Sequence, residues 1–290
     1  MFGGEWTEEK LRILKGYLDA YTQALKNKPF DLLYIDSFAG TGYREMEPEE
    51  PEGVSLFEEL LAEETEELLD GSARISLQIQ RPFDRYIFVE MSPEKARRLE
   101  ALKEDFPELA DRIVVEVEDC NSYLQAKCRQ ETWRGRRAVL FLDPFGMQVE
   151  WATMESIAAT GTIDTWVLFP ISAVNRMLPR SGEIPAGWEQ RLDKLFGTHE
   201  WHSTFYRLKP IKPLFGQKKR PVKKVCRMKD ICQYYLDRLR TVFPAVAEHP
   251  RWLCNSRGTP LFVFCFAMAN PSQSAQNLAL RIAQHLLREE

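Results

Sequence analysis

A segment suited to binding a nucleotide lies near the start of the chain. It reads DSFAGTG from Asp36 to Gly42 and directly follows the apolar run LLYI. A buried strand that continues into a loop of small residues lets a ligand approach the backbone closely, because a Cβ at Gly40 or Gly42 would block that approach. A tight turn from a strand into a helix also requires glycine, so the two glycines alone leave a purely structural role open.

Acidic residues follow the next two apolar runs as well. Glu90 ends the run RYIFVE, and a carboxylate at that end of a strand can accept hydrogen bonds from both hydroxyls of a ribose. Alternatively, Glu90 is a charge that stabilises the N-terminus of a helix beginning at Pro93. Asp119 follows the run IVVEVE, where it can also serve as the N-cap of the next helix.

A fourth acidic position carries groups suited to an amine acceptor. The run AVLFLD ends at Asp143 and is followed by Pro144, Phe145 and Gly146. The Asp143 carboxylate and the Pro144 carbonyl can accept the two hydrogens of an exocyclic amine, and the Phe145 ring offers a stacking face worth about 1–3 kcal/mol for a base. Methyl transfer to such an amine depends on positioning and electrostatics. An aspartate that only caps the turn after a strand is the alternative.

These motifs resemble those of known methyltransferases. D-x-F-A-G-x-G is similar to the first motif of S-adenosylmethionine-dependent methyltransferases, and D-P-F-G resembles the acceptor motif D-P-P-Y of amino-methyltransferases, especially the version in tRNA guanine-N2 methyltransferases. The segments YIDSFAGTG, PFDRYIFVE, FLDPFGMQVEW and IDTWVLFPISAVNRML further resemble the three-Cys-motif partner family. The absent third glycine disfavours another nucleotide cofactor, NAD.

The resemblance implies a class I methyltransferase fold, S-adenosylmethionine as cofactor, and a bacterial mobile-element or defence setting beside a partner protein with a three-cysteine motif. It implies a cofactor site formed by Asp36, Phe38, Ala39, Gly40 and Gly42 on the methionine side, Glu90 at the ribose, and Asp119 with Cys120 near the adenine. It implies an acceptor site formed by Asp143, Pro144 and Phe145. For Cys120, burial as a small core residue is the simpler alternative.

The elements that must hold these residues alternate between strand and helix periods, which is typical of an α/β domain. We predict strands over residues 32–36, 85–90, 113–117, 138–143 and 165–170, with helices over 93–106, 121–129 and 150–159 between them. The expected fold is Rossmann-like, with a mostly parallel seven-stranded sheet. An antiparallel hairpin is predicted from residues 252–254 and 261–268, followed by a helix that begins near Pro271. A first helix over 8–25, with Thr7 as N-cap, is expected to serve in packing.

The charges are distributed unevenly along the chain. Residues 45–70 contain twelve acidic and no basic residues, and we interpret 45–72 as an acidic insertion. Residues 207–229 contain ten basic and no acidic residues, within an expected helical and basic cap over 175–245. Basic side chains there suit contact with the phosphates of a nucleic acid, although a solvated loop is an equal alternative. The predicted contacts are Lys218, Lys219, Arg220, Lys223 and Lys224.

Composition restricts the class of protein. The 290 residues, 44% hydrophobic and 28% charged, can form one large domain or two small ones. The resemblance implies a single methyltransferase-like domain over 1–290. Six cysteines without a C-x-x-C pair do not indicate a zinc site, and no apolar leader or membrane-spanning run is present, so we expect a cytoplasmic protein. Methyl transfer to an exocyclic amine of RNA or DNA is the predicted activity. A catalytically silent scaffold for the three-Cys-motif partner is the alternative.

Overall fold

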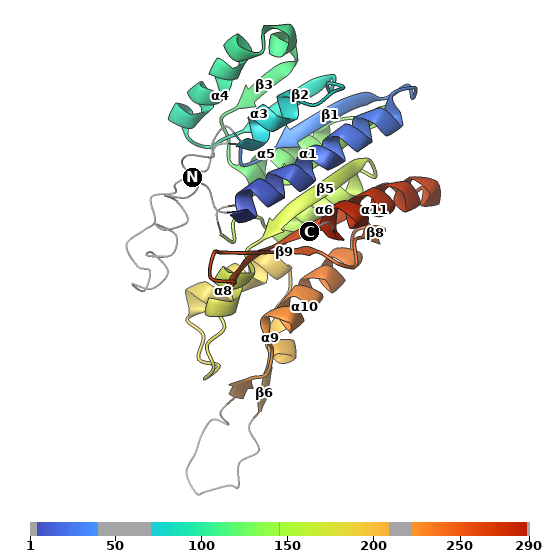
Figure 1. The fold of residues 1–290 in the computed structure, drawn as a ribbon. Coiled ribbons are helices and arrows are strands. Elements are labelled where there is room, and N and C mark those ends of the chain that lie inside the picture. Colours follow the sequence, from blue (N-terminus) through green and yellow to red (C-terminus); the bar gives the residue numbers. More distant parts are fainter. Residues whose placement is uncertain (1–4, 40–70, 145, 209–221, 289–290) are drawn as a thin grey trace, which may run out of the picture.

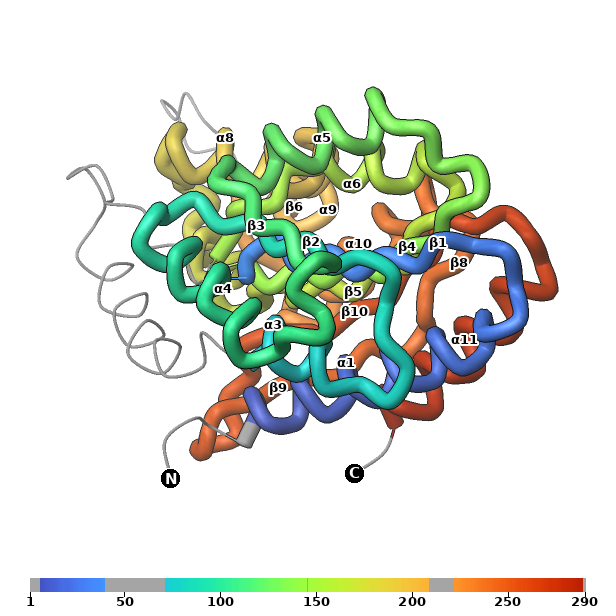
Figure 2. The backbone as a smooth tube through the Cα atoms, turned by 90° about the horizontal axis from the view of Figure 1, so that it is seen from above, coloured from blue at the N-terminus to red at the C-terminus, as the bar shows by residue number. Residues whose placement is uncertain are grey.

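A central β-sheet lies between two layers of helices (Figure 1). The computed structural model describes residues 5–39, 71–144, 146–208 and 222–288. One face of the sheet is covered by α1 (Glu5–Leu25), α3 (Gly71–Leu77), α4 (Pro93–Asp105) and α11 (Gln273–Arg288). The other face is covered by α5 (Cys120–Gln130), α6 (Trp151–Ala159), α7 (Ile171–Arg176) and α10 (Met228–Arg240). Seen from above, α1 and α11 lie across the sheet from α5 and α6 (Figure 2).

The sheet follows the order β3-β2-β1-β4-β5-β10-β8, and β9 also pairs with β10. The first five of these strands are mutually parallel, and β10 is antiparallel to its neighbours. The strands are β1 (Asp31–Asp36), β2 (Arg85–Val89), β3 (Ile113–Glu116), β4 (Arg136–Leu142), β5 (Ile163–Phe169), β8 (Ala245–Val246), β9 (Arg251–Cys254) and β10 (Pro260–Met268). A short 3₁₀ helix, η1 (Pro107–Arg112), precedes β3.

Eight strands occupy seven positions across this sheet. Val263 of β10 pairs with Phe169 of β5 on one side and with Trp252 of β9 on the other. Further along β10, Ala267 pairs with β5 and with Val246 of β8. The short strands β8 and β9 therefore lie on the same side of β10 and form one interrupted edge. The predicted α/β class, the mostly parallel sheet and the closing hairpin are confirmed.

The inner strands are buried on both faces because their side chains alternate between two cores. In β1, Leu33 and Ile35 belong to the core beneath α5 and α6, whereas Leu32 and Tyr34 belong to the core beneath α1 and α11. This double burial explains why continuous apolar runs identified these strands. The observed bounds of the five predicted parallel strands differ from the expected ones by at most two residues at either end.

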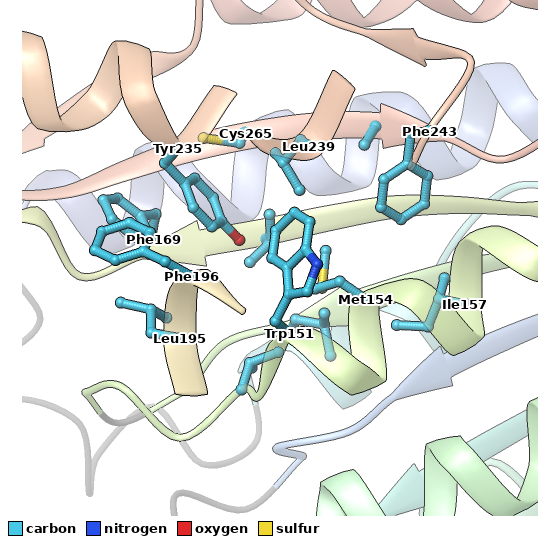
Figure 3. Close-up of a cluster of buried hydrophobic side chains, with 14 of the residues drawn as sticks. Trp151, Met154, Ile157, Phe169, Leu195, Phe196, Tyr235, Leu239, Phe243 and Cys265 are labelled. Carbon is cyan, nitrogen blue, oxygen red and sulfur yellow. The ribbon is translucent and has the colours of Figure 1, made fainter. Parts of the chain in front are cut away.

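The region after β5 packs onto the α6 side of the sheet. It contains α7, α8 (Ala186–Phe196), α9 (Glu200–Phe205) and α10, whose buried apolar side chains join the core that includes Trp151 of α6. Figure 3 shows side chains of α8 and α10 around Trp151, among them Phe196 and Leu239. The rings of Phe169 and Tyr235 stack with centroids 4.0 Å apart, and the Arg238 guanidinium lies 4.4 Å from the centre of the Trp151 ring. These contacts join the cap to the body of the sheet.

A two-stranded antiparallel ribbon forms within the basic region. It consists of β6 (Tyr206–Leu208) and β7 (Val222–Lys224). Arg207 lies directly opposite Lys223, and Tyr206 lies opposite Lys224. Residues 209–221 between these strands are outside the described part of the chain, and with them Lys218, Lys219 and Arg220.

The start of α1 differs from its prediction. The helix begins at Glu5, so Thr7 lies inside its first turn and is buried, and its role as N-cap is wrong. The helix extends to residues before Glu8 because Trp6 packs on β10. The centroid of the Trp6 ring lies 5.1 Å from that of Phe262. By contrast, α4 begins at Pro93 as expected, and the side chain of its N-cap, Ser92, accepts a hydrogen bond from the Lys95 amide.

Candidate functional site

The chain reverses direction within the sheet between β1 and β4. From β1 it continues outward to β2 and β3, whereas β4 lies on the other side of β1 and leads to β5. The carboxyl ends of β1 and β4 therefore form a topological switch point, the usual ligand position in open α/β sheets. Asp36 ends β1 in register with Phe141, and Asp143 follows β4. The fold thus brings together the strand ends that carry the predicted cofactor loop and the predicted acceptor motif.

Asp36 is fully buried at the end of β1. The Phe38 amide donates a hydrogen bond to Asp36 Oδ1, and the Tyr34 hydroxyl donates one to Oδ2, each with a donor–acceptor distance of 3.4 Å. Burial raises the pKa of Asp36 to about 7, and the nearby Asp143 carboxylate adds to this effect, while Ser72, the Phe38 amide and Lys10 oppose it. The group can therefore change its ionisation near neutral pH.

Asp143 forms an ion pair with Lys10 of α1. The Lys10 ammonium lies 2.5 Å from Asp143 Oδ2, across 133 positions of sequence. The Lys10 side chain is 5% exposed and that of Asp143 is 18% exposed. Trp6 and Phe141 border the ammonium, with ring centres 5.3 and 5.9 Å away. One carboxylate oxygen of Asp143 is thus bound within the protein.

Lys10 was not among the predicted site residues. The first helix was expected to serve in packing, but it also contributes this ammonium to the edge of the sheet. A sequence signal exists: Lys10 lies four residues after Trp6 and four before Leu14, both buried, so a charge interrupts the apolar face of the helix. A lysine on such a face is rarely buried unless it is paired.

Glu90 lies directly after β2 and is 3% exposed. Its Oε1 accepts a hydrogen bond of 2.6 Å from the Ser92 amide, just ahead of α4. Its backbone amide donates to the Glu116 carbonyl of β3. The carboxylate therefore has the contact expected of a group at a helix N-terminus, and it also lies at the strand end where a ribose site was predicted.

Asp119 is the N-cap of α5, and Cys120 is the first residue of that helix. Asp119 Oδ1 accepts hydrogen bonds from the Ser122 amide at 3.0 Å and from the Ser122 hydroxyl at 3.2 Å. Cys120 is 5% exposed, and burial raises the pKa of its thiol well above the ordinary value. These positions agree with the alternatives of a helix cap and a small core residue. A role for either side chain near an adenine remains a prediction.

The segment that follows Asp143 is held by the start of α5. The Asn121 side chain donates to the Gln148 carbonyl at 2.8 Å and accepts from the Glu150 amide at 2.9 Å. Gly146 has a φ of +87°, a conformation that favours glycine. Pro144 is buried, whereas Phe145 is outside the described residues.

The remaining predicted cofactor residues belong to the loop after β1. Phe38 is half-buried against the core beneath α5 and α6, and Ala39 is buried, with its amide donating to the Val89 carbonyl of β2. Gly40 and Gly42 lie outside the described residues.

The two predicted basic contacts in β7 have different surroundings. Lys223 is exposed. The Lys224 ammonium donates hydrogen bonds to the Asn175 carbonyl at 3.1 Å and to Asn175 Oδ1 at 2.7 Å. Burial and the adjacent Arg180 lower the pKa of Lys224, although the neighbouring Cys226 opposes this shift. Lys223 is therefore the better placed of the two for a phosphate.

No group of three or more His, Cys, Asp or Glu residues in the described part of the chain is arranged to hold a metal ion. None of the helices described has the length and apolar character needed to cross a membrane.

No family model matches this chain, and no curated protein matches its sequence. Among solved structures, a protein from Legionella pneumophila is 17% identical, with 96% of this chain and 92% of that chain covered and a TM-score of 0.41. Spermidine synthase from Thermotoga maritima is 10% identical, with coverage of 92% and 60% and a TM-score of 0.39. An Escherichia coli protein named as a methyltransferase is 16% identical, with coverage of 72% and 84% and a TM-score of 0.29.

The strand order itself defines the fold. Five parallel strands in the order β3-β2-β1-β4-β5 are followed by the antiparallel β10 and an outer edge, with helices on both faces. The chain therefore has a Rossmann-like fold.

Proposed function

We propose that this protein transfers a methyl group from S-adenosylmethionine to an exocyclic amine of a nucleic-acid base. The observation that carries the proposal is the position of Asp143, which follows β4 at the switch point beside the buried Asp36 at the end of β1. The resemblance of D-P-F-G to the acceptor motif of amino-methyltransferases supports the same activity. The alternative remains a scaffold of the same fold that acts through its partner.

The charges at this edge of the sheet fit a cationic cofactor. Asp36 ends β1 and Glu90 follows the adjacent strand β2, so two carboxyl groups lie at the part of this edge that carries the predicted cofactor loop. When bound, S-adenosylmethionine supplies an activated methyl group on a sulfonium. Asp36 and the loop that follows it would hold the methionine end, and Glu90 would accept hydrogen bonds from the ribose.

Asp143 and Pro144 would orient the acceptor amine. Asp143 Oδ1 has no hydrogen-bond partner among the described residues, so it is available to accept one amine hydrogen. The Pro144 carbonyl would accept the second. The acceptor nitrogen forms a bond to the methyl carbon as the sulfur–carbon bond breaks; the products are the methylated base and S-adenosylhomocysteine, and the surplus proton passes through Asp143 to solvent.

The positive charges on the ribbon formed by β6 and β7 favour a polyanionic substrate. Arg207 and Lys223 face each other directly across this ladder, a placement that destabilises an isolated ribbon. Neither side chain forms an ion pair among the described residues. A phosphate between the two cations would offset their repulsion.

The first test is calorimetric titration of the protein with S-adenosylmethionine, with NAD as control. We expect binding of S-adenosylmethionine alone. Methyl transfer is then measured from tritiated cofactor to bulk tRNA and to plasmid DNA. Replacing Asp143 by Ala should lower transfer at least about 100-fold with little change in cofactor affinity, because the acceptor contacts are separate from the cofactor contacts. Cofactor binding without transfer to either nucleic acid would favour the scaffold.

The nucleic-acid contact has its own test. Binding of tRNA is measured by fluorescence anisotropy across a salt series for the wild type, Arg207→Gln and Lys223→Gln. Each substitution should reduce the slope of log affinity against log salt by about one. Lys28→Gln, an exposed change just after α1, is the matched control. Unchanged slopes in both ribbon variants would exclude the ribbon as a phosphate contact.

A further inference from the structure

The ion pair between Lys10 and Asp143 has a geometry suited to catalysis as well as to folding. The ammonium occupies Asp143 Oδ2 at 2.5 Å, and the carboxylate retains partial exposure. The second oxygen, Oδ1, has no partner among the described residues. A carboxylate held at one oxygen has its other oxygen fixed in direction, which is what recognition of an amine hydrogen requires.

Lys10 is itself held from several directions. Its side chain is 5% exposed and lies near the rings of Trp6 and Phe141. The first turns of α1 are anchored to the far edge of the sheet, since Glu9 forms an ion pair with Arg251 of β9 and Trp6 packs on Phe262 of β10. The ammonium is therefore fixed by the helix that carries it. A flexible surface lysine would not restrain a carboxylate in this way.

We propose that Lys10 is a positioning residue for the methyl acceptor: it holds Asp143 at Oδ2, so that Oδ1 is fixed in direction to receive the amine. The inference rests on the proposed function, because it assigns the acceptor contact to Asp143. It adds α1 to the acceptor site, an element that contributes none of the residues predicted from the motifs.

The other titratable groups that face Asp143 define what a change at Lys10 would do. Within the described residues, they are Asp36 and Tyr34, both of β1. Without the ammonium, the carboxylate of Asp143 would lie beside the Asp36 carboxyl group with no cation paired to it, and Oδ1 would lose its fixed direction.

The test compares Lys10→Met, which keeps an unbranched chain and removes the charge, with Lys10→Arg, which keeps the charge. Lys15→Met is the matched control, because Lys15 pairs with Asp19 on the exposed side of the same helix. Transfer from tritiated S-adenosylmethionine to bulk tRNA is measured from pH 6 to pH 9. We expect about a 10- to 100-fold loss of kcat for Lys10→Met at pH 7, with the cofactor Kd unchanged.

The pH profile separates positioning from a loss of folding. For Lys10→Met, the acid side of the activity profile should move to higher pH, and activity should partly recover as the pH rises. Lys10→Arg should retain the wild-type profile with an intermediate kcat, and Lys15→Met should match the wild type. Equal kcat and equal profiles for Lys10→Met and the wild type would overturn the assignment of Lys10 and leave the proposed function intact.

A second readout does not depend on an acceptor. The carboxyl carbon of Asp143 is followed by NMR in protein labelled with ¹³C-aspartate, with the Asp143→Asn spectrum identifying the signal. The midpoint of its titration should be higher in Lys10→Met than in the wild type and unchanged in Lys15→Met. An unchanged midpoint overturns the electrostatic role of Lys10. A shifted midpoint in a protein that transfers no methyl group overturns the proposed function, and Lys10 then has a structural role alone.

Discussion

Asp36 combines burial with a position at the ligand edge of the sheet. Its pKa is raised to about 7, chiefly by burial, so Asp36 gains or loses its proton in the neutral pH range. A cationic ligand placed nearby would favour the ionised form. Ligand binding and loss of the Asp36 proton are then coupled.

This coupling predicts how cofactor affinity changes with pH. S-adenosylmethionine should bind more tightly as the pH rises from 6 to 8, because less Asp36 has to lose a proton on binding. Calorimetry in two buffers of different ionisation enthalpy should detect proton release near pH 7. In Asp36→Asn, affinity should be weaker and the release absent. Equal proton release in the wild type and this variant would show that another group is responsible.

At the same scale, the sequence identified residues whose chemistry follows from their neighbours in the chain. Asp36 and Asp143 were predicted because each ends an apolar run, and that pattern specifies a strand end. Lys10 was missed because its role depends on a contact across 133 positions. Glu90 and Asp119 remained ambiguous, since an acidic residue before a helix can cap that helix or bind a ligand, and both have capping contacts.

Helix α8 ends at Gly197, where the Trp151 side chain of α6 leaves no space for a Cβ atom. Gly197 adopts a φ of +68°, and a Cβ placed there would lie 2.1 Å from Cδ1 of Trp151. The left-handed conformation alone costs an L-residue roughly 1–2 kcal/mol. The contact adds to this cost, because Trp151 is also packed against Arg238 of α10 and has no room to move.

Gly197→Ala should therefore lower the free energy of unfolding by more than about 1 kcal/mol, with a fall in Tm of several degrees. The measurement is urea unfolding followed by circular dichroism. Gly187→Ala in the same helix is the matched control: nothing lies within 4 Å of its Cβ position, and alanine should stabilise the helix by up to about 1 kcal/mol. Equal effects of the two substitutions would contradict this account of the α6–α8 contact.

The elements themselves were largely predictable, and the reason is double burial. A strand covered on both faces needs a continuous apolar run, so the five parallel strands could be read directly. The ribbon of β6 and β7 could not, because its three-residue strands lie in a basic stretch without alternation. The first turn of α1 was missed for a related reason: it is stabilised by packing on β10, and no local signal marks that contact.

For the whole molecule, buried carboxyl groups make stability depend on pH. Asp164 at the start of β5 is 3% exposed and accepts a hydrogen bond of 2.6 Å from Tyr17. Burial raises its pKa to about 7, with Tyr17 and Arg137 opposing the shift. Between about pH 4 and pH 7 the folded state binds more protons than the unfolded state at this group, so stability falls as the pH rises.

Asp164→Asn should remove this part of the dependence while retaining an acceptor for the Tyr17 hydroxyl. Between pH 5 and pH 7, the unfolding free energy of the wild type should fall more steeply with pH than that of Asp164→Asn. We expect the two slopes to differ by about 1.4 kcal/mol per pH unit. The measurement is urea unfolding at half-unit pH intervals. Asp111→Asn, at an exposed position, should leave the slope as it is in the wild type. A wild-type slope in Asp164→Asn would mean that Asp164 is ionised throughout this range.

The anchoring of α1 to β9, β10 and α11 also concerns the order of events in folding. Glu9 reaches Arg251, Trp6 reaches Phe262, and Gly16 lies against Leu286, so each of these contacts closes a loop of more than 240 residues. Closing loops of this length costs more conformational entropy than pairing neighbouring strands, so α1 is expected to dock late. The contact of Lys10 with Asp143 would then be made in the last stage of folding, and the ligand edge of the sheet would be completed by its slowest step.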